Sequence, residues 1–172
     1  MTPEQASTLA SHLLATIQQE SRITRNVIAA LPEDKCGYRI HAKARTALEL
    51  AWHIVLIEMW FLDSIFQGQF YTGPAEEVPA EIKTAADVIS WYDTQLPGNL
   101  QKAGRLSGEY LARPMNFMKK ADYPGVIFLQ ILLSHTIHHR GQFAAYLRAM
   151  GAKVPRIYYG SLDEPADATA KA

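Results

Sequence analysis

The chain has 172 residues, of which 48% are hydrophobic, and its 17 Lys and Arg are balanced by 17 Asp and Glu. This length suits one domain with a substantial core, and the balanced charge lacks the basic excess typical of nucleic-acid binders. The single cysteine, Cys36, excludes an internal disulfide and fits a reducing compartment.

The first helix is predicted at the N-terminus itself. Thr2 can act as its N-cap, Pro3 fits the first helical position, and Gln5 completes a capping box. Leucine, isoleucine and valine then recur at helical spacing. The helix is expected to end near Leu31, because Pro32 cannot continue it.

The second predicted helix follows a loop over residues 32–45. Thr46 and Glu49 have the spacing of a capping box, and the helix is expected to run to about Gln67, with Gly68 as its stop. Its surface is apolar almost all round, which is typical of a helix that is central in a monomer or lies at a subunit interface. Both alternatives stay open, and the second predicts a homodimer.

The third predicted helix follows a loop over residues 68–83 that is rich in Gly, Pro and Glu. Thr84 and Asp87 open it with the same capping pattern. Pro97 lies inside it and cannot donate a hydrogen bond to the carbonyl of Asp93, so a kink or a break is expected there.

The fourth predicted helix comes after an irregular stretch over residues 108–122. Pro124 suits its first turn, and it is expected to run to about Met150, with Gly151 just beyond the end. Four helices joined by loops predict an all-α four-helix bundle. We expect a single domain over residues 1–163 and a disordered tail over residues 164–172.

No segment for export or membrane insertion is recognisable. The start, MTPEQAST, lacks the basic and apolar regions of a signal peptide. The longest apolar stretch, Ile54 to Leu62, is broken by Glu58 and is shorter than the roughly 20 residues that span a bilayer. We therefore expect a cytoplasmic protein with no membrane and no nucleic-acid partner.

The fourth helix carries the residues with the clearest chemistry. His135 and His139 are four residues apart, so both point to one face of the helix. His53 lies in the most apolar part of the second helix and can supply a third imidazole. Neutral imidazoles bind Zn, Ni, Cu or Fe, and three of them leave coordination positions open. The pattern predicts one divalent metal ion on His53, His135 and His139.

The alternative reading is a set of ordinary core histidines, although buried ring nitrogens in an apolar helix each need a partner. His138 is expected to be exposed or to support the site, and His12 and His41 to lie on the surface. The chain has neither HExxH nor paired ExxH motifs, which weighs against a zincin protease and a di-iron bundle. Cys36 lies in a loop with Lys35 and Arg39, whose charges would lower its thiol pKa somewhat, but the expected role of Cys36 is that of a bystander thiol.

Three segments of the sequence carry a resemblance to the DinB (damage-inducible) and YfiT-like metalloenzymes, and the resemblance covers nearly the whole chain in order. They are HTIHHRGQFAAYLRAMGAKVP with the following IYYG, LELAWHIVLIEMWFL, and LPEDKCGYR. The resemblance implies a four-helix bundle, usually dimeric, with a histidine triad for Ni or Zn. Its ligands fall on His53, His135 and His139, while Ser134 stands where the family usually has Asn.

The resemblance also bears on function, because some family members are S-transferases that use mycothiol, bacillithiol or glutathione. We therefore expect a metal-dependent thiol S-transferase that acts on small electrophiles, with a small-molecule substrate and a low-molecular-weight thiol. The alternatives are a non-enzymatic metal-binding stress-response module and a metal-dependent hydrolase. Beside the ligands, Gly141 is expected to allow close helix approach, Gln142 to reach a ligand or substrate, and Arg140 to pair with an acidic residue or lie on the surface.

Overall fold

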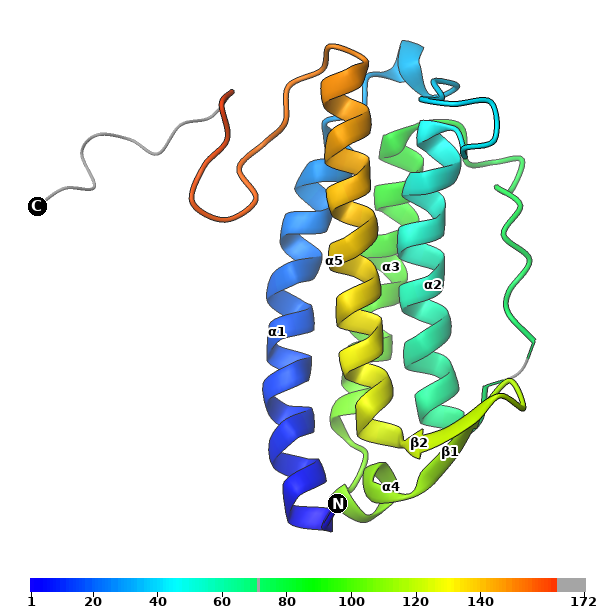
Figure 1. Cartoon of the computed structure of the whole chain (residues 1–172), viewed down its shortest axis with the longest axis vertical. Coiled ribbons are helices and arrows are strands. Elements are labelled where there is room, and N and C mark those ends of the chain that lie inside the picture. The colour runs from blue at the N-terminus through cyan, green and yellow to red at the C-terminus, as the bar shows by residue number, and fades with distance from the viewer. Residues whose placement is uncertain (71, 164–172) are drawn as a thin grey trace, which may run out of the picture.

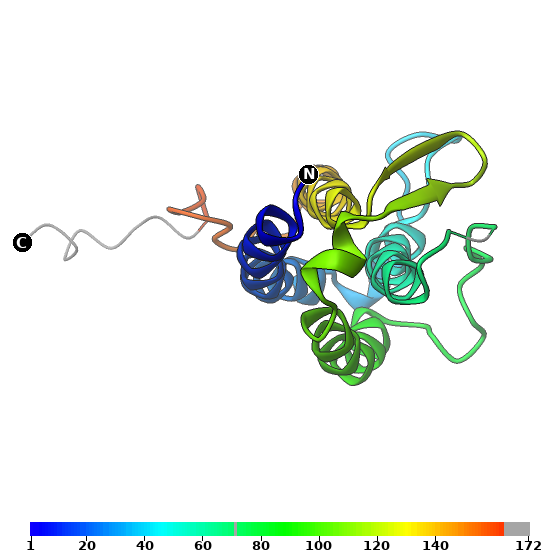
Figure 2. The same ribbon diagram turned by 90° about the horizontal axis from the view of Figure 1, so that it is seen from below.

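Four long helices lie side by side in the computed structural model, which describes residues 1–70 and 72–163 (Figure 1). They are α1 (Pro3–Ala29), α2 (Ala47–Gln67), α3 (Ala85–Gly104) and α5 (Gly125–Ala149). Each packs against two others in the ring order α1, α5, α2, α3 (Figure 2). The predicted all-α four-helix bundle is therefore confirmed, whereas the predicted tail lies outside the described residues.

The helix starts follow the predicted caps. In α1, α2 and α3 a threonine side chain accepts a hydrogen bond from the backbone three residues on, and the side chain at that position bonds back to the threonine. The pairs are Thr2–Gln5, Thr46–Glu49 and Thr84–Asp87. At the other end of α2, Gly68 has a φ of 78°, a left-handed conformation that glycine adopts without a steric penalty.

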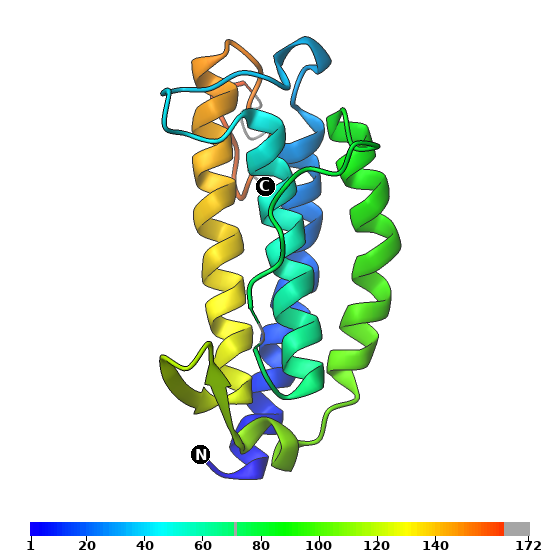
Figure 3. The same cartoon turned by 90° about the vertical axis from the view of Figure 1, so that its right-hand side faces the viewer.

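The path of the chain places a long connection beside α2. Helices α1 and α5 run in one direction along the bundle, and α2 and α3 run in the other (Figures 1 and 3). Because α2 and α3 are parallel, the chain between them has to return along the whole bundle. This crossover segment, defined here as residues 69–70 and 72–83, therefore runs beside α2 and can bring its polar side chains to a site on that helix (Figure 3).

The prediction of an irregular stretch over residues 108–122 is wrong. It contains the short helix α4 (Gly108–Ala112) and the antiparallel strands β1 (Pro114–Phe117) and β2 (Ala121–Pro124), with Pro114 opposite Pro124 and Phe117 opposite Ala121. The hairpin lies across the end of the bundle where α5 begins (Figure 1). Its turn places Met118 and Lys119 in the left-handed region, with φ of 51° and 59°.

Two prolines lie at or within helices. Of the two effects expected of Pro97, the break does not occur: helix α3 continues through it, and Pro97 and Asp93 both lie on the exposed side, where a carbonyl without its usual donor can bind water. Pro124 is the N-cap of α5 rather than a residue of its first turn.

The apolar surface of α2 is buried within a single chain. Fourteen of its 21 residues are buried between the neighbouring helices, which favours the central-helix interpretation of its composition. None of the described helices combines the length and hydropathy needed to cross a membrane.

Candidate metal centre

Three histidines from two neighbouring helices converge. His135 and His139 lie one turn apart on α5, with ring centroids 4.4 Å apart. The ring of His53 on α2 lies 5.1 Å from that of His135 and 4.6 Å from that of His139. One nitrogen from each ring falls within 4.8 Å of the other two. The structure thus brings together the three residues that the sequence singled out.

Hydrogen bonds fix the orientation of two of the rings. His53 Nδ1 lies 3.0 Å from Glu76 Oε2, and His139 Nδ1 lies 2.9 Å from Gln142 Oε1. Both oxygens are acceptors, so each Nδ1 carries the hydrogen and each Nε2 presents a lone pair. Burial by itself raises the pKa of Glu76, but the hydrogen bond from Arg45 and the neighbouring His53 outweigh it and lower that pKa. Glu76 therefore stays ionised and accepts.

The separation of the two free nitrogens suits a shared ion. His53 Nε2 and His139 Nε2 are 3.4 Å apart, which is longer than the usual nitrogen–oxygen hydrogen bond of about 2.7–3.2 Å. Two lone pairs facing each other at this distance repel unless a cation lies between them. Nitrogens on a tetrahedral ion with bonds of about 2.0–2.1 Å stand about 3.3 Å apart, so the spacing matches that arrangement.

His135 has a ring nitrogen that lacks a partner. Its Nδ1 is buried and receives no hydrogen bond from the described residues, an arrangement that costs free energy. Burial and then the positive charges of His139 and His53 lower the pKa of His135 to about 3. Burial is also the main cause that lowers the pKa of His53 and His139. Three neutral imidazoles fit the donor set of a divalent transition-metal ion.

Glu76 is a residue that the sequence analysis missed. It lies in the crossover segment, 23 residues after His53, and no helical spacing connects the two. It reaches His53 only because parallel α2 and α3 require the chain to return beside α2. Gln142, by contrast, stands three residues after His139, and the expectation that it reaches a ligand residue is confirmed by its hydrogen bond.

Replacing Glu76 with alanine should weaken metal binding by about 10–100-fold, because His53 loses the acceptor that orients its ring and increases its basicity. Glu77→Ala is the matched control, since Glu77 is the next residue of the same segment and is exposed. Competition titration of each variant with a chromophoric chelator measures the affinity. Equal affinities for the two variants would show that Glu76 does not support the site.

The other histidines lie where they were expected. His138, His12 and His41 are exposed, although the ring of His138 lies 4.8 Å from that of His139. Ser134, at the position where the family usually has Asn, is exposed and accepts a 3.4 Å hydrogen bond from Gln130.

The expectations for the packing of Gly141 and for the thiol pKa of Cys36 are wrong. A Cβ added to Gly141 would meet nothing within 4 Å, so this glycine does not serve close helix approach. The thiol pKa of Cys36 is raised rather than lowered, because burial outweighs the hydrogen bond from the Ala85 backbone and nearby acidic residues add to it.

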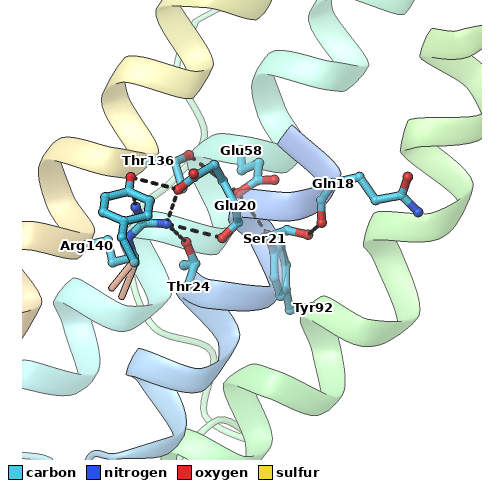
Figure 4. Close-up of polar contacts among 9 residues, drawn as sticks. Gln18, Glu20, Ser21, Thr24, Glu58, Tyr92, Thr136 and Arg140 are labelled. Carbon is cyan, nitrogen blue, oxygen red and sulfur yellow. Dashed lines mark hydrogen bonds and ion pairs between the residues drawn. The ribbon is translucent and has the colours of Figure 1, made fainter. Parts of the chain in front are cut away.

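A buried polar network joins side chains from all four long helices (Figure 4). Arg140, which follows His139, is 2% exposed and forms a 2.5 Å ion pair with Glu20 of α1. The expectation that Arg140 pairs with an acidic residue is therefore confirmed over the surface alternative. Its other partners are the Glu20 carbonyl, Thr24 and Tyr158.

Glu58 of α2 is the second buried carboxyl of this network. Its Oε2 accepts hydrogen bonds from Tyr92 of α3 at 2.9 Å and from Thr136 of α5 at 3.4 Å, while its buried Oε1 has no partner among the described residues. Burial raises the pKa of Glu58 to about 7, against the lowering effect of these hydrogen bonds and of Arg140. Glu58 therefore holds its proton through the mildly acidic range.

Glu58 should make the fold less stable as the pH rises. The folded-state pKa is about 7 and the ordinary value is 4.5, so the folded state binds more protons between these limits and stability falls through that window. The contribution between pH 5 and pH 8 is about 2 kcal/mol. Measured by urea unfolding, the stability of the wild type relative to Glu58→Gln should fall by this amount between the two pH values, because the lowered histidine pKa values change the stability of both proteins equally. Exposed Glu81→Gln is the control, and parallel pH profiles for wild type and Glu58→Gln would contradict the account.

Comparison with known proteins places this arrangement in a family. The model of the DinB family matches residues 4–171. The Bacillus subtilis proteins YrdA and YjoA, both described as uncharacterized, are 27% and 25% identical over 158 and 151 residues. These alignments cover 89% and 86% of this chain, and 90% and 92% of the relatives.

Solved structures show the same fold. The crystal structure of the DinB-like protein YjoA from Bacillus subtilis superposes with a TM-score of 0.68 at 22% identity, covering 87% of this chain and 97% of that one. A DinB-like protein from Bacillus cereus gives a TM-score of 0.72 at 24% identity, covering 85% and 95%.

Proposed function

The chain belongs to the DinB family, and from this membership and its converging imidazoles we propose that it is a metal-dependent thiol S-transferase acting on small electrophiles. One divalent ion, nickel or zinc, would be held by His53, His135 and His139. The observation that carries the proposal is the 3.4 Å approach of two Nε2 atoms whose Nδ1 partners are already engaged.

The side chains of the site would have two kinds of role, binding the ion and orienting its ligands. A bound divalent ion supplies a Lewis acid that lowers the pKa of a thiol and yields a thiolate near neutral pH. His53, His135 and His139 provide the neutral donors, and Glu76 and Gln142 hold two of the rings in position. His135 and His139 are only half-buried, so small molecules can approach the open side of the cluster.

The proposed reaction joins a low-molecular-weight thiol to an electrophilic carbon. The sulfur forms a new bond to that carbon, the bond from the carbon to its leaving group breaks, and the leaving group departs with the electron pair. The thiol proton goes to solvent or to the leaving group. The products are a thioether, the leaving group and one proton, so no oxidant or reductant is needed.

The sequence suggests an apolar pocket for the electrophile lined by Trp52, Trp60 and Tyr146, but the burial of Trp52 and Tyr146 does not suit that role. Trp52 is buried against Trp91, with the two rings tilted by 59°, and the buried Tyr146 donates its hydroxyl hydrogen to the carbonyl of Arg45. Trp60 is half-buried against Phe61, whose ring lies 6.4 Å from that of His135, and remains available for such a role.

Two other functions are less well supported. A metal hydrolase needs a general base near the ion, and the carboxylate at the cluster, Glu76, is a poor one because its pKa is lowered. A non-enzymatic metal-binding stress-response module would favour a closed coordination sphere, whereas three imidazoles leave coordination positions open.

The transferase is tested by assaying protein loaded with nickel or zinc. Glutathione, coenzyme A, bacillithiol and mycothiol are each offered with 1-chloro-2,4-dinitrobenzene or monobromobimane as the electrophile. We expect turnover with at least one thiol and its loss in His135→Ala that retains the wild-type circular dichroism spectrum. Absence of turnover with every pair, from protein that carries one ion per chain, would contradict the transferase and favour the non-enzymatic module.

Two further features belong to the proposal. We expect a homodimer, as is usual for the family, although the burial of α2 within one chain removes the structural reason that first suggested it. Sedimentation equilibrium at micromolar concentration measures the assembly, and a monomeric mass would refute it. A cytoplasmic location is expected because the single cysteine excludes an internal disulfide.

A further inference from the structure

The loop before α2 is strongly basic. Residues 35–45 contain four cationic side chains, Lys35, Arg39, Lys43 and Arg45, and no Asp or Glu. The whole chain is electrically balanced, so this loop is a local concentration of positive charge. It lies at the end of the bundle where α2 begins and α5 ends (Figure 1).

Arg45 brings that charge to the edge of the histidine cluster. Its guanidinium and His53 Nδ1 bind the same oxygen of Glu76, so a single carboxylate oxygen separates Arg45 from a ring of the cluster. The Arg45 carbonyl accepts a 3.0 Å hydrogen bond from Tyr146, which stands one turn beyond Gln142 on α5. Arg45 is therefore fixed beside both helices that carry the histidines.

The guanidinium of Arg45 keeps donors for a further ligand. Its side chain is 43% exposed, and Glu76 is its one side-chain partner among the described residues. A guanidinium has five N–H donors, in a planar fork that matches a carboxylate. Its positive charge also acts on the cluster, since it helps to lower the pKa of His53 and of His139.

Arg39 is about as exposed as Arg45, but its hydrogen-bond partners are different. Its Nη1 donates to the carbonyl of Ala44 at 2.7 Å, and its Nη2 binds Glu49 at 3.3 Å. These contacts hold the basic loop against the first turn of α2. Arg39 thus has a structural role, and among the described residues it makes no contact with the cluster.

From this placement we infer that Arg45 binds a carboxylate of the thiol substrate, so that the protein selects an anionic thiol over a neutral one. The inference rests on the proposed function, because the sulfur must be directed to the ion at the histidines. The thiol then contacts the site at two points, with its sulfur at the cluster and its carboxylate at the fork of Arg45. A neutral thiol of the same size has only the first contact.

The test uses cobalt(II)-loaded protein, in which thiol binding appears as a sulfur-to-cobalt absorption band. Titrations with 3-mercaptopropionate and with 2-mercaptoethanol give two dissociation constants, and their ratio measures the preference for an anionic thiol. The ratio is compared among wild type, Arg45→Gln, Arg45→Lys and the matched control Arg39→Gln. Comparing ratios cancels differences in thiol acidity and any direct contact of the carboxylate with cobalt.

We expect a wild-type ratio in favour of 3-mercaptopropionate that falls about tenfold or more in Arg45→Gln, because a charge-assisted hydrogen bond is lost. Arg45→Lys should fall between the two, since lysine keeps the charge without the fork, and Arg39→Gln should match the wild type. An unchanged d–d spectrum in Arg45→Gln shows that the cluster itself is intact.

Two results would overturn the inference, and each identifies a different failure, that of the carboxylate subsite or that of the metal centre. If cobalt binds and the sulfur band appears, but the ratio is the same in wild type and Arg45→Gln, the carboxylate subsite is wrong and the metal centre stands. If the wild type shows no d–d bands before any thiol is added, the proposed metal centre fails, and the inference about Arg45 fails with it.

Discussion

Replacing Arg140 with methionine should lower the free energy of unfolding of the metal-free protein by about 3–5 kcal/mol, the usual cost of leaving a buried charge without its partner. Glu20 would then stay in the interior, where its side chain is 9% exposed, opposite a methionine that offers no donor. Tyr158 and Thr24 would lose a partner as well. Urea unfolding followed by circular dichroism measures the loss.

The control for this variant is Arg148→Met on the same helix. Arg148 pairs with Asp163 at 2.8 Å, but its side chain is 49% exposed, so its loss should cost less than about 1 kcal/mol. The double variant Glu20→Gln/Arg140→Met should recover part of the stability, because it removes the unpaired charge. If Arg140→Met costs no more than Arg148→Met, the buried pair does not stabilise the bundle.

Replacing His139 with alanine should reduce metal affinity by more than the about 10–100-fold that loss of an outer hydrogen-bond partner costs. It removes one of the three donors and also the nitrogen that lies 3.4 Å from His53 Nε2. The fold should persist, because the ring lies at the half-exposed edge of the core. Competition titration with nickel and with zinc measures both affinities.

His138→Ala is the matched control for the His139 variant. It removes an imidazole from the adjacent position, yet His138 is exposed and takes no part in the three-nitrogen cluster. Its affinity should equal that of the wild type. Equal losses from the two substitutions would mean that the metal binds histidines nonspecifically at the surface of α5.

The helices and their histidines could be predicted because local rules govern them. A threonine followed three residues later by Gln, Glu or Asp fixes a helix start through its own hydrogen bonds, as at Thr46 and Glu49. Likewise, their four-residue spacing places His135 and His139 on the same face of a helix. Apolar periodicity then shows which face of each helix is buried, and His53 lies on α2 among such apolar residues.

The features that could not be predicted depend on tertiary context. The strands of the β1–β2 hairpin have only four residues each. Its turn residues Met118 and Lys119 adopt the left-handed conformation that Gly or Asn usually provides, so the turn has no recognisable sequence signal. Glu76 reaches His53 through a long connection without periodicity, so nothing local marks it. The expectation that Gly141 allows close helix approach came from the resemblance to the family, whereas a Cβ added at this position would meet nothing within 4 Å.

The buried network shows the same limit. Glu58 stands five residues after His53, a spacing that does not place the two on one helix face, and in the structure it bonds to Tyr92 and Thr136 instead. Its full burial could not be read from the sequence, since a single Glu in an apolar helix is also compatible with an exposed position. The partners on α3 and α5 are defined only once the ring order of the helices is known.

X-ray absorption at the nickel or zinc edge tests the central claim most directly, because it counts the donors around the ion in solution. For protein loaded with one ion per chain, we predict three imidazole nitrogens at about 2.0–2.1 Å, falling to two in His139→Ala and staying at three in His138→Ala. A coordination sphere of oxygen alone, or one unchanged by the loss of His139, would contradict the claim that these two helices together bind a metal ion.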